Sequence, residues 1–295
     1  MLMEPLEGDR SLDSSNSESE LPEGFKIIHN HPNPNFYLLA HLNNVADIRY
    51  ENFHHIVKVL CHGIFTAPIE DALTRGIRVL DAGCGYGTWC LEMARDYPQS
   101  TFVGIDIDDL LPKTDIPQNC TFLKGDTREL PFEDSSFDYI YQRGMILSFT
   151  PEDWTRTVAE LYRVLRPGGW LEFFEPQFAF ERRPHDYNKF YNALLTITEA
   201  KGFDITLPLH LLDILPPTLT NVEVDYVSCP VGWKGSIGST ALANFEIIMR
   251  SLKPQLGELI DVADYDEFVS KILVEFRAFK SWIKFPYAFG MKPVT

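Results

Sequence analysis

Three glycines at alternate positions form the stretch of this chain best suited to hold a ligand. Gly83, Gly85 and Gly87 follow a predicted strand that ends at Asp81, and a helical pattern follows over residues 89–96. Glycine reaches positive φ angles and has no Cβ atom to hold a ligand away from the backbone. A helix that begins beside such a turn presents unpaired N–H groups and a partial positive charge. The pattern predicts a nucleotide-type ligand site, with an ordinary strand-turn-helix corner as the alternative.

Polar side chains also end the next three predicted strands. Asp106 lies at the end of a buried strand over residues 101–107, where an acidic side chain can accept both ribose hydroxyls of a nucleoside. Asp126 and Thr127 end a strand over residues 119–127, and Asp126 could also be a helix N-cap. Residues 142–145, from Gln142 onward, end the fourth strand. Because ligands of open parallel sheets bind beyond the carboxyl ends of the strands, we expect these residues at one site.

The spacing of the glycines separates two kinds of nucleotide ligand. A dinucleotide-binding loop requires Gly or Ala at the sixth position of G-x-G-x-x-G, and Thr88 stands there in this chain. Asp126 also counts against that class, through the family resemblance described below. A nicotinamide-dependent oxidoreductase is therefore the disfavoured alternative.

Strand and helix patterns alternate along the part of the chain that must position these residues. The predicted strands cover residues 77–81, 101–107, 119–127, 136–143, 170–173, 221–228 and 285–291. Helices are predicted over residues 45–65, 68–76, 89–96, 154–165, 187–201, 207–215, 240–253 and 264–282. The sequence predicts an α/β, Rossmann-like fold whose seven-stranded, mostly parallel sheet has helices on both faces. Helix 45–65 could cover the ligand site, and residues 177–217 with the loop 232–238 are the predicted substrate cover.

Together these motifs resemble those of class I S-adenosylmethionine-dependent methyltransferases. The resemblance rests on Asp81 before a G-x-G-x-G loop, on Asp106, on Asp126, and on the Pro167-Gly168-Gly169 turn before a strand. Within that class the chain is most similar to the fungal LaeA-like proteins, from about Asn43 to the end. The matching stretches are His54-His55, Ala67-Pro68-Ile69, Gly87-Thr88-Trp89, Tyr97-Pro98, Gly168 to Glu172, Gly235 to Gly238, Leu252-Lys253-Pro254 and Met291-Lys292-Pro293. The glycine loop departs from these relatives at Ala82, Cys84 and Tyr86.

The resemblance implies S-adenosyl-L-methionine as cofactor and methyl transfer by in-line displacement to a small molecule or a protein. It places the amino acid and sulfonium parts of the cofactor along the glycine loop near Asp81. It also implies that Asp126 takes the adenine amino group and that the backbone N–H of Thr127 takes a ring nitrogen. The predicted cofactor contacts are Asp81, Gly83, Cys84, Gly85, Asp106, Ile107, Asp126, Thr127 and Gln142.

Catalytic residues are harder to predict, because transfer from a sulfonium depends mainly on alignment and desolvation. A general base is required only for a poorly ionised acceptor, and the candidates are His54, His55, Glu175 and His185. Ordinary structural roles are the alternative for each. The aromatic residues that could line an acceptor pocket are Phe149, Trp154, Phe178, Phe180, Trp233 and Tyr287. A non-catalytic regulator that keeps the fold and is linked to secondary metabolism is the alternative function.

Composition narrows the class of protein further. The 295 residues carry a formal net charge of −16, which opposes nucleic-acid binding, and no apolar run reaches the roughly 20 residues that span a bilayer. Five cysteines without C-x-x-C spacing predict neither a zinc site nor a disulfide framework, and they fit a cytoplasmic or nuclear location. Residues 1–24 are expected to form a disordered acidic tail. Residues 25–295 are expected to form the methyltransferase domain, with a cofactor-binding core at 77–176, cover and late helices at 177–284, and a closing strand at 285–295. The oligomeric state is left open.

Overall fold

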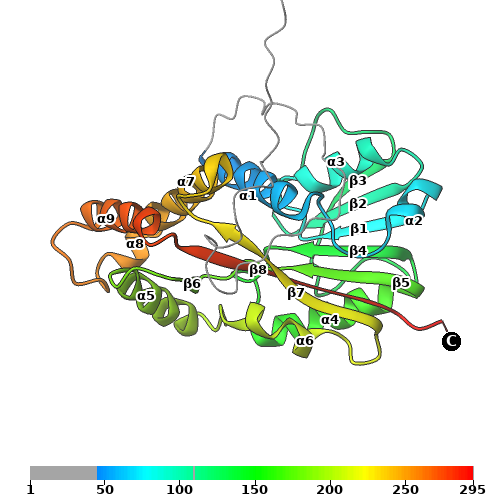
Figure 1. Cartoon of the computed structure of the whole chain (residues 1–295). Helices are drawn as coiled ribbons and strands as arrows, with labels where there is room; N and C mark the ends of the chain where they lie inside the picture. Colours follow the sequence, from blue (N-terminus) through cyan, green and yellow to red (C-terminus); the bar gives the residue numbers. More distant parts are fainter. Residues whose placement is uncertain (1–44, 109, 295) are drawn as a thin grey trace, which may run out of the picture.

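A mixed sheet runs through the centre of the computed structural model, which describes residues 45–108 and 110–294. Five parallel strands lie in the order β3-β2-β1-β4-β5, and β8 then pairs antiparallel with β5. The other side of β8 pairs with the edge strand β7, and the short β6 also pairs with β8 (Figure 1). The strands are β1 Arg78–Ala82, β2 Thr101–Asp106, β3 Cys120–Lys124, β4 Phe137–Arg143, β5 Leu165–Phe174, β6 Phe180–Glu181, β7 Thr220–Pro230 and β8 Trp282–Met291.

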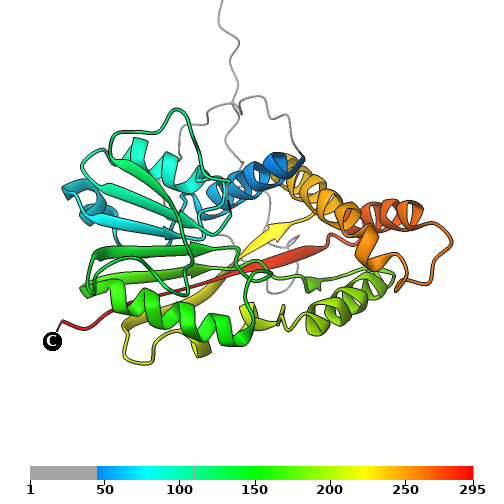
Figure 2. The same ribbon diagram turned by 180° about the vertical axis from the view of Figure 1, so that it is seen from behind.

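Helices cover both faces of this sheet. Figures 1 and 2 show α1, α3 and α7 over one face and α4 and α6 over the other. The helices are α1 Val45–Cys61, α2 Glu70–Arg75, α3 Thr88–Asp96, α4 Pro151–Val164, α5 Tyr187–Ala200, the 3₁₀ helix η2 Leu207–His210, α6 Leu211–Ile214, α7 Gly235–Ser251, α8 Lys253–Leu256 and α9 Tyr265–Ala278. No helix within the described residues combines the length and apolarity needed to cross a bilayer.

Local sequence signals explain where several of these elements begin. Thr150 caps α4 by accepting a hydrogen bond from the N–H of Asp153, whose side chain bonds back to Thr150, and Pro151 occupies the first helical turn. The side chain of Asp264 caps α9 in the same way by accepting from two backbone N–H groups. Strand β1 is buried on both faces, as expected for a central parallel strand.

Two buried groups attach the α1 end of the chain to the sheet. Trp89 on α3 stacks on Tyr141 with ring centroids 4.3 Å apart, and its Nε1 donates to the carbonyl of Ile64 at 2.6 Å. The carboxylate of Glu172 on β5 accepts from the N–H and hydroxyl of Thr66, from the N–H of Ala67 and from a tyrosine hydroxyl on β4. Burial raises the pKa of Glu172 to about 6, against the effect of these donors. The segment between α1 and α2 is therefore fixed to β5.

The predicted fold class is confirmed, and the differences from it are local. All seven predicted strands are present, and the two-residue β6 makes an eighth. Helix α7 begins at Gly235 rather than at residue 240, so the predicted loop over 232–238 is mostly helix. Gly238 is needed inside that helix because a Cβ there would lie 1.6 Å from the carbonyl oxygen of Trp233. Strand β8 begins at Trp282, which was predicted to be helical, because its first residues pair with both β6 and β7.

Two predictions about domain organisation are not tested by this structure. The expected disordered tail over residues 1–24 lies outside the described residues. The division of the remaining chain at residues 176 and 284 stays a prediction.

Candidate functional site

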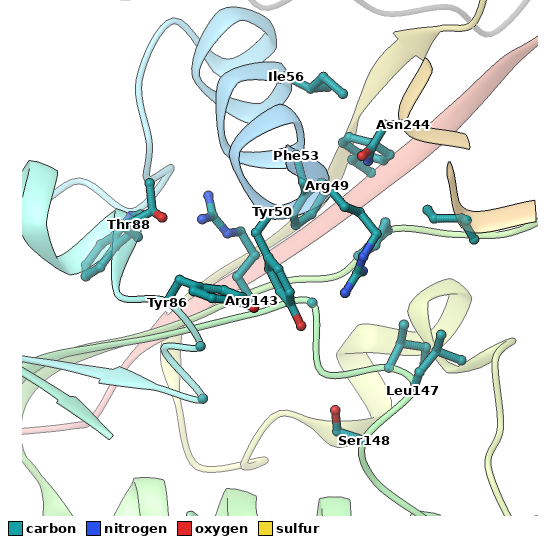
Figure 3. A pocket seen from close by; sticks show the side chains of 18 of the residues that line it. Arg49, Tyr50, Phe53, Ile56, Tyr86, Thr88, Arg143, Leu147, Ser148 and Asn244 are labelled. Carbon is teal, nitrogen blue, oxygen red and sulfur yellow. The ribbon is translucent and has the colours of Figure 1, made fainter. Parts of the chain in front are cut away.

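A cavity of about 240 Å³ lies beyond the carboxyl ends of β1, β4 and β5 (Figure 3). Its floor comes from the glycine loop after β1 and from the chain that follows β4 and β5. Helix α1 forms one wall, as Figure 3 shows from the positions of Arg49, Tyr50 and Phe53, and α7, which packs beside α1, adds Asn244 to the lining. The predicted covering role of the helix before the first strand is thus consistent with the structure.

The glycine loop itself is held by backbone hydrogen bonds to β2. The N–H groups of Gly83 and Cys84 both donate to the carbonyl of Ile105, at 2.8 and 3.0 Å. Gly83 and Gly85 have φ angles of +78° and +53°, and both line the cavity with Cys84. A Cβ at Gly83 would lie 2.5 Å from Sδ of Met145, so this glycine makes room for a protein side chain. A Cβ at Gly85 would meet only Tyr50, at 3.8 Å.

Asp81 is the one acidic residue among the described residues that line the cavity. Its side chain is buried, and its Oδ2 has no hydrogen-bond partner within the described part of the chain. Burial raises the pKa of Asp81 to about 7, and the nearby Arg143 guanidinium limits that rise. A buried acceptor without a donor is costly, which suits a ligand that brings a positively charged donor.

The other predicted acidic contacts are bonded to the protein instead. Asp106 accepts from the N–H of Gly85 at 2.8 Å and from the N–H of Asp108 at 2.9 Å, so its side chain holds the glycine loop in place. Asp126 is paired with Arg128 at 2.7 Å, and this guanidinium holds its pKa below the usual range. Neither carboxylate lines the cavity, so the structure brings only Asp81 to it.

The remaining predicted cofactor contacts also lie outside the cavity lining. Ile107 is 55% exposed, whereas Thr127 is buried. Gln142 is fully buried, and neither polar atom of its amide has a hydrogen-bond partner among the described residues. The roles of these residues in cofactor binding stay predictions.

None of the predicted general bases lines the cavity. His54 is buried between α1, α3 and β4, where its Nε2 contacts Oε2 of Glu92 at 2.8 Å and its Nδ1 contacts Nη2 of Arg143 at 3.1 Å. Burial lowers the pKa of His54 to about 4. His55 on the same helix is partly buried, and burial lowers its pKa as well. The side chain of His185 is 94% exposed.

Glu175 has a structural role in the turn after β4. Its two carboxylate oxygens accept from the N–H groups of Met145 and Ile146, each at 3.0 Å. Burial raises the pKa of Glu175 to about 8 despite these bonds. The residue shapes the cavity floor without facing it.

Sequence reasoning missed the residues that α1 and α7 contribute. Arg49 and Tyr50 reach into the cavity from α1, with the guanidinium carbon 4.3 Å from the tyrosine ring centroid (Figure 3). Tyr50 also contacts Tyr86 of the glycine loop, with centroids 5.0 Å apart. Asn244 enters from α7. No local motif marks these positions, and only their helical periodicity could have indicated which face meets the site.

Of the six aromatic residues predicted to line an acceptor pocket, Phe178 does so. Phe149 and Trp154 pack together in the core, and Phe180 stacks on Phe276 with centroids 4.4 Å apart. Trp233 donates from its Nε1 to the carbonyl of Ser281, and Tyr287 packs against Phe289. Among the described residues, no three His, Cys, Asp or Glu side chains are placed to share a metal ion.

Comparison with known proteins identifies the central part of the chain. Residues 79–169 match the family model of the methyltransferase domain. The chain is 34% identical over 129 residues to methyltransferase pytC of Aspergillus terreus, a match that covers 43% of this chain and 38% of that protein. It is 31% identical over 140 residues to the secondary metabolism regulator laeA of Monascus pilosus, covering 44% and 35% of the two chains. The chain thus spans well under half the length of these relatives.

A solved structure is also similar. It is phosphoethanolamine N-methyltransferase 2 of Haemonchus contortus in complex with S-adenosyl-L-methionine, with 19% identity and a TM-score of 0.49 over 83% of this chain and 53% of that one. The matches to the domain family and to the two fungal proteins confirm the predicted resemblance to methyltransferases and to LaeA.

Proposed function

We propose that this chain, whose residues 79–169 are a methyltransferase domain, transfers a methyl group from S-adenosyl-L-methionine to an acceptor bound in the cavity. The observation that carries the proposal is the unpaired carboxylate oxygen of Asp81, buried in the cavity wall beside Gly83 and Gly85. The carboxylate oxygen of Asp81 can accept a hydrogen bond in this position, and the glycine backbone beside it leaves room for a ligand. Such a place suits the ammonium of an amino acid group.

The residues present fit such a cofactor. Asp81 would receive the cationic amino acid part, and the backbone of Gly83 and Gly85 would allow close approach. Asp106, at the end of β2, would accept hydrogen bonds from the ribose hydroxyls, and its present hydrogen bond from the N–H of Asp108 would be replaced by one from the sugar. Asp126 and Thr127 would serve the adenine. When bound, the cofactor supplies a methyl group already activated by a sulfonium.

The chain itself would contribute alignment and the exclusion of water. Tyr50 and Phe53 of α1 lie over the glycine loop and the turn after β4, with Phe53 3.5 Å from the position of a Cβ at Gly144. The apolar lining from α1, α7 and β8 desolvates the reacting atoms. Holding donor and acceptor in one orientation supplies a large part of the rate enhancement in such displacements.

Calorimetric titration tests the cofactor assignment directly. We expect the wild-type chain to bind S-adenosylmethionine and S-adenosylhomocysteine, and Asp81→Asn to weaken both by about tenfold or more, since a charge-assisted bond is lost. Asp71→Asn, an exposed change on α2, is the matched control. Incubation with labelled donor and cell extract should then place label in an acceptor fraction. Failure of the wild-type chain to bind either compound would rule out the proposal.

A non-catalytic regulator is the second candidate function. It is favoured by the match to a protein described as a secondary metabolism regulator and by the bonds that Asp106 and Asp126 already make within the protein. A regulator that has lost the site would bind no cofactor, whereas the proposed enzyme would bind it and transfer label.

The acceptor is proposed to be a small molecule or a protein, and the oligomeric state is left open. The five cysteines are all free thiols, which supports a reducing compartment such as the cytoplasm or nucleus.

A further inference from the structure

The part of the cavity away from the glycine loop has an apolar wall. It is lined by Phe53 of α1, Phe178 after β5, Phe245 and Ile248 of α7, and Phe285 of β8. Aromatic walls of this kind favour flat, apolar ligands, because ring contacts add to the gain from burying apolar surface. A polar acceptor such as a sugar or a short peptide would leave its polar groups without partners there.

Two cationic groups border this apolar space. Arg49 extends its guanidinium from α1 into the cavity, beside Tyr50 and toward Leu147 and Ser148 (Figure 3). No ion pair joins it to a carboxylate among the described residues, and its guanidinium lies over the face of the Tyr50 ring. Arg143 also lines the cavity, and its Nη1 is buried without a hydrogen-bond partner in the described structure. Both groups would stabilise negative charge on a bound molecule.

A second polar feature comes from α7, which packs beside α1. Asn244 of α7 is only 6% exposed, and its amide oxygen has no hydrogen-bond partner among the described residues. The side chain lines the cavity and faces α1 (Figure 3). A buried carbonyl oxygen without a donor destabilises the fold, so its retention in a cavity wall points to a ligand that supplies an N–H or O–H.

The same lining offers no side chain suited to act as a base on the acceptor. Its described members include no histidine, lysine or glutamate, and the one acidic residue, Asp81, lies at the glycine loop. Burial raises the pKa of the Cys84 thiol, so a thiolate is disfavoured there. The lining formed by the described residues therefore suits an acceptor whose nucleophile ionises by itself, and cationic neighbours favour that ionisation.

We infer that the acceptor is a small, flat, largely apolar ring compound bearing an acidic hydroxyl, a phenol or an enol, whose oxyanion is held by Arg49 and whose second hydroxyl or N–H donates to Asn244. The inference rests on the proposed methyltransferase function and names its substrate class. The acidic hydroxyl loses its proton to solvent, and an oxygen lone pair forms the new O–CH₃ bond. The S–CH₃ bond breaks with its electron pair going to sulfur, so the sulfonium becomes a neutral thioether.

Four probes of equal ring size test this class: 1,3-dihydroxynaphthalene, 2-naphthol, 2-naphthalenemethanol and 2-naphthylmethylamine. Each is titrated against the full chain saturated with S-adenosylhomocysteine, and each is then assayed with labelled donor. We expect the dihydroxy compound to bind best, 2-naphthol next, and the non-acidic alcohol and the ammonium compound at least about tenfold more weakly, as loss of a charge-assisted bond predicts.

Two variants connect that preference to named residues. Arg49→Gln should remove the preference for the acidic hydroxyl over the alcohol, and Asn244→Leu should remove the advantage of the second hydroxyl. Arg75→Gln and Asn192→Leu, exposed changes on α2 and α5, are the matched controls and should leave both preferences unchanged. Asn244→Leu should also raise the melting temperature, because it removes an unpaired buried oxygen, which a merely structural asparagine would not do.

Each outcome separates the inference from the function on which it rests. Absence of S-adenosylhomocysteine binding would contradict the proposed function. Normal binding of that compound together with equal affinity for all four probes, or tighter binding of the ammonium compound, would overturn the substrate class alone. Label from a cell extract recovered in protein rather than in small molecules would overturn it as well.

Discussion

Arg143 at the end of β4 donates a hydrogen bond from Nη2 to Nδ1 of His54 on α1, over 3.1 Å. A guanidinium has no acceptor, so Nδ1 must accept and the proton of the neutral ring must lie on Nε2, which faces Glu92 on α3. His54 therefore joins three elements around the cavity in one protonation state. Lys58 adds a second link from α1 to the same Glu92 carboxylate.

This arrangement predicts a stability that depends on pH through His54. Its pKa is lowered to about 4 in the folded chain and returns to about 6.5 on unfolding, so the unfolded state binds more protons between these values. The contribution of His54 to the free energy of unfolding should therefore fall by about 3 kcal/mol as the pH falls from 6.5 to 4. His54→Gln should remove this decrease, so the stability profiles of variant and wild type should diverge over this range in urea denaturation at several pH values.

His185→Gln is the matched control, because that imidazole is 94% exposed and makes only a long contact with Asp186. Its profile should follow the wild type. A His54→Gln chain whose stability profile between pH 6.5 and 4.5 runs parallel to that of the wild type would contradict the assigned role of His54.

Asp81 should make cofactor affinity depend on pH. Its pKa of about 7 means that the carboxylate is mostly protonated at pH 6 and mostly ionised at pH 7.5. Since only the ionised form attracts an ammonium, the affinity for S-adenosylhomocysteine should rise about tenfold over this range. Calorimetric titration at the two pH values measures the change, and Asp81→Asn should bind weakly at both.

The same substitution should stabilise the chain at alkaline pH. The folded pKa of Asp81 is raised above its unfolded value near 3.8, so its contribution to stability falls as the pH rises from about 4 to 7. Asp81→Asn should thus lower affinity and raise the melting temperature at pH 8. If Asp81→Asn lowered both the cofactor affinity and the melting temperature, Asp81 would have a role in the fold only.

Two glycines distinguish backbone strain from ligand contact. Gly85 and Gly235 both have positive φ angles, +53° and +75°, so alanine at either should cost about 1–2 kcal/mol of stability. A Cβ at Gly235 would meet nothing within 4 Å, whereas one at Gly85 would point toward Tyr50 in the cavity. Gly85→Ala should therefore weaken S-adenosylhomocysteine binding about tenfold, or 1.4 kcal/mol, and Gly235→Ala should not. Equal affinities in the two variants would remove Gly85 from the ligand site.

Glu172 should be among the most sensitive positions for stability. Its carboxylate accepts from three groups of the Thr66–Ala67 segment and from the hydroxyl of Tyr139. Glutamine would replace one of its two accepting oxygens by a donor, which would leave buried N–H groups unpaired. We expect Glu172→Gln to lower the free energy of unfolding by about 3 kcal/mol at pH 7. Glu199→Gln on the exposed side of α5 is the control, and similar losses in the two variants would contradict the prediction.

The parallel strands could be anticipated because several of them have a local signature. Glycines follow β1, Asp106 is the last residue of β2, and Asp126 follows β3, so these strand ends could be located without knowledge of any long-range contact. The limits of β8 and α7 could not be predicted in this way. Trp282 is a strand residue because β6 and β7 pair with it, and Gly235 begins a helix because the backbone of Trp233 packs against Gly238.

The candidate site was predictable only on its sheet side. Asp81 and the loop glycines follow from spacing, but Arg49 and Asn244 come from helices far apart in the sequence, whose contact depends on tertiary packing. Asp106 and Asp126 lie outside the cavity lining and bond to Gly85 and Arg128, and their part in cofactor binding stays a prediction. The residue types in a sequence indicate which charged side chains a site could contain. Which hydrogen-bond donors lie next to those side chains is known only from the folded structure.

Helix α1 borders both halves of the cavity, with Tyr50 at the glycine loop and Phe53 on the apolar wall. Two ligands that contact the same helix can be thermodynamically linked through it, and such linkage is reciprocal. S-adenosylhomocysteine and the ring compound should therefore each lower the dissociation constant of the other by the same factor, whichever is added first.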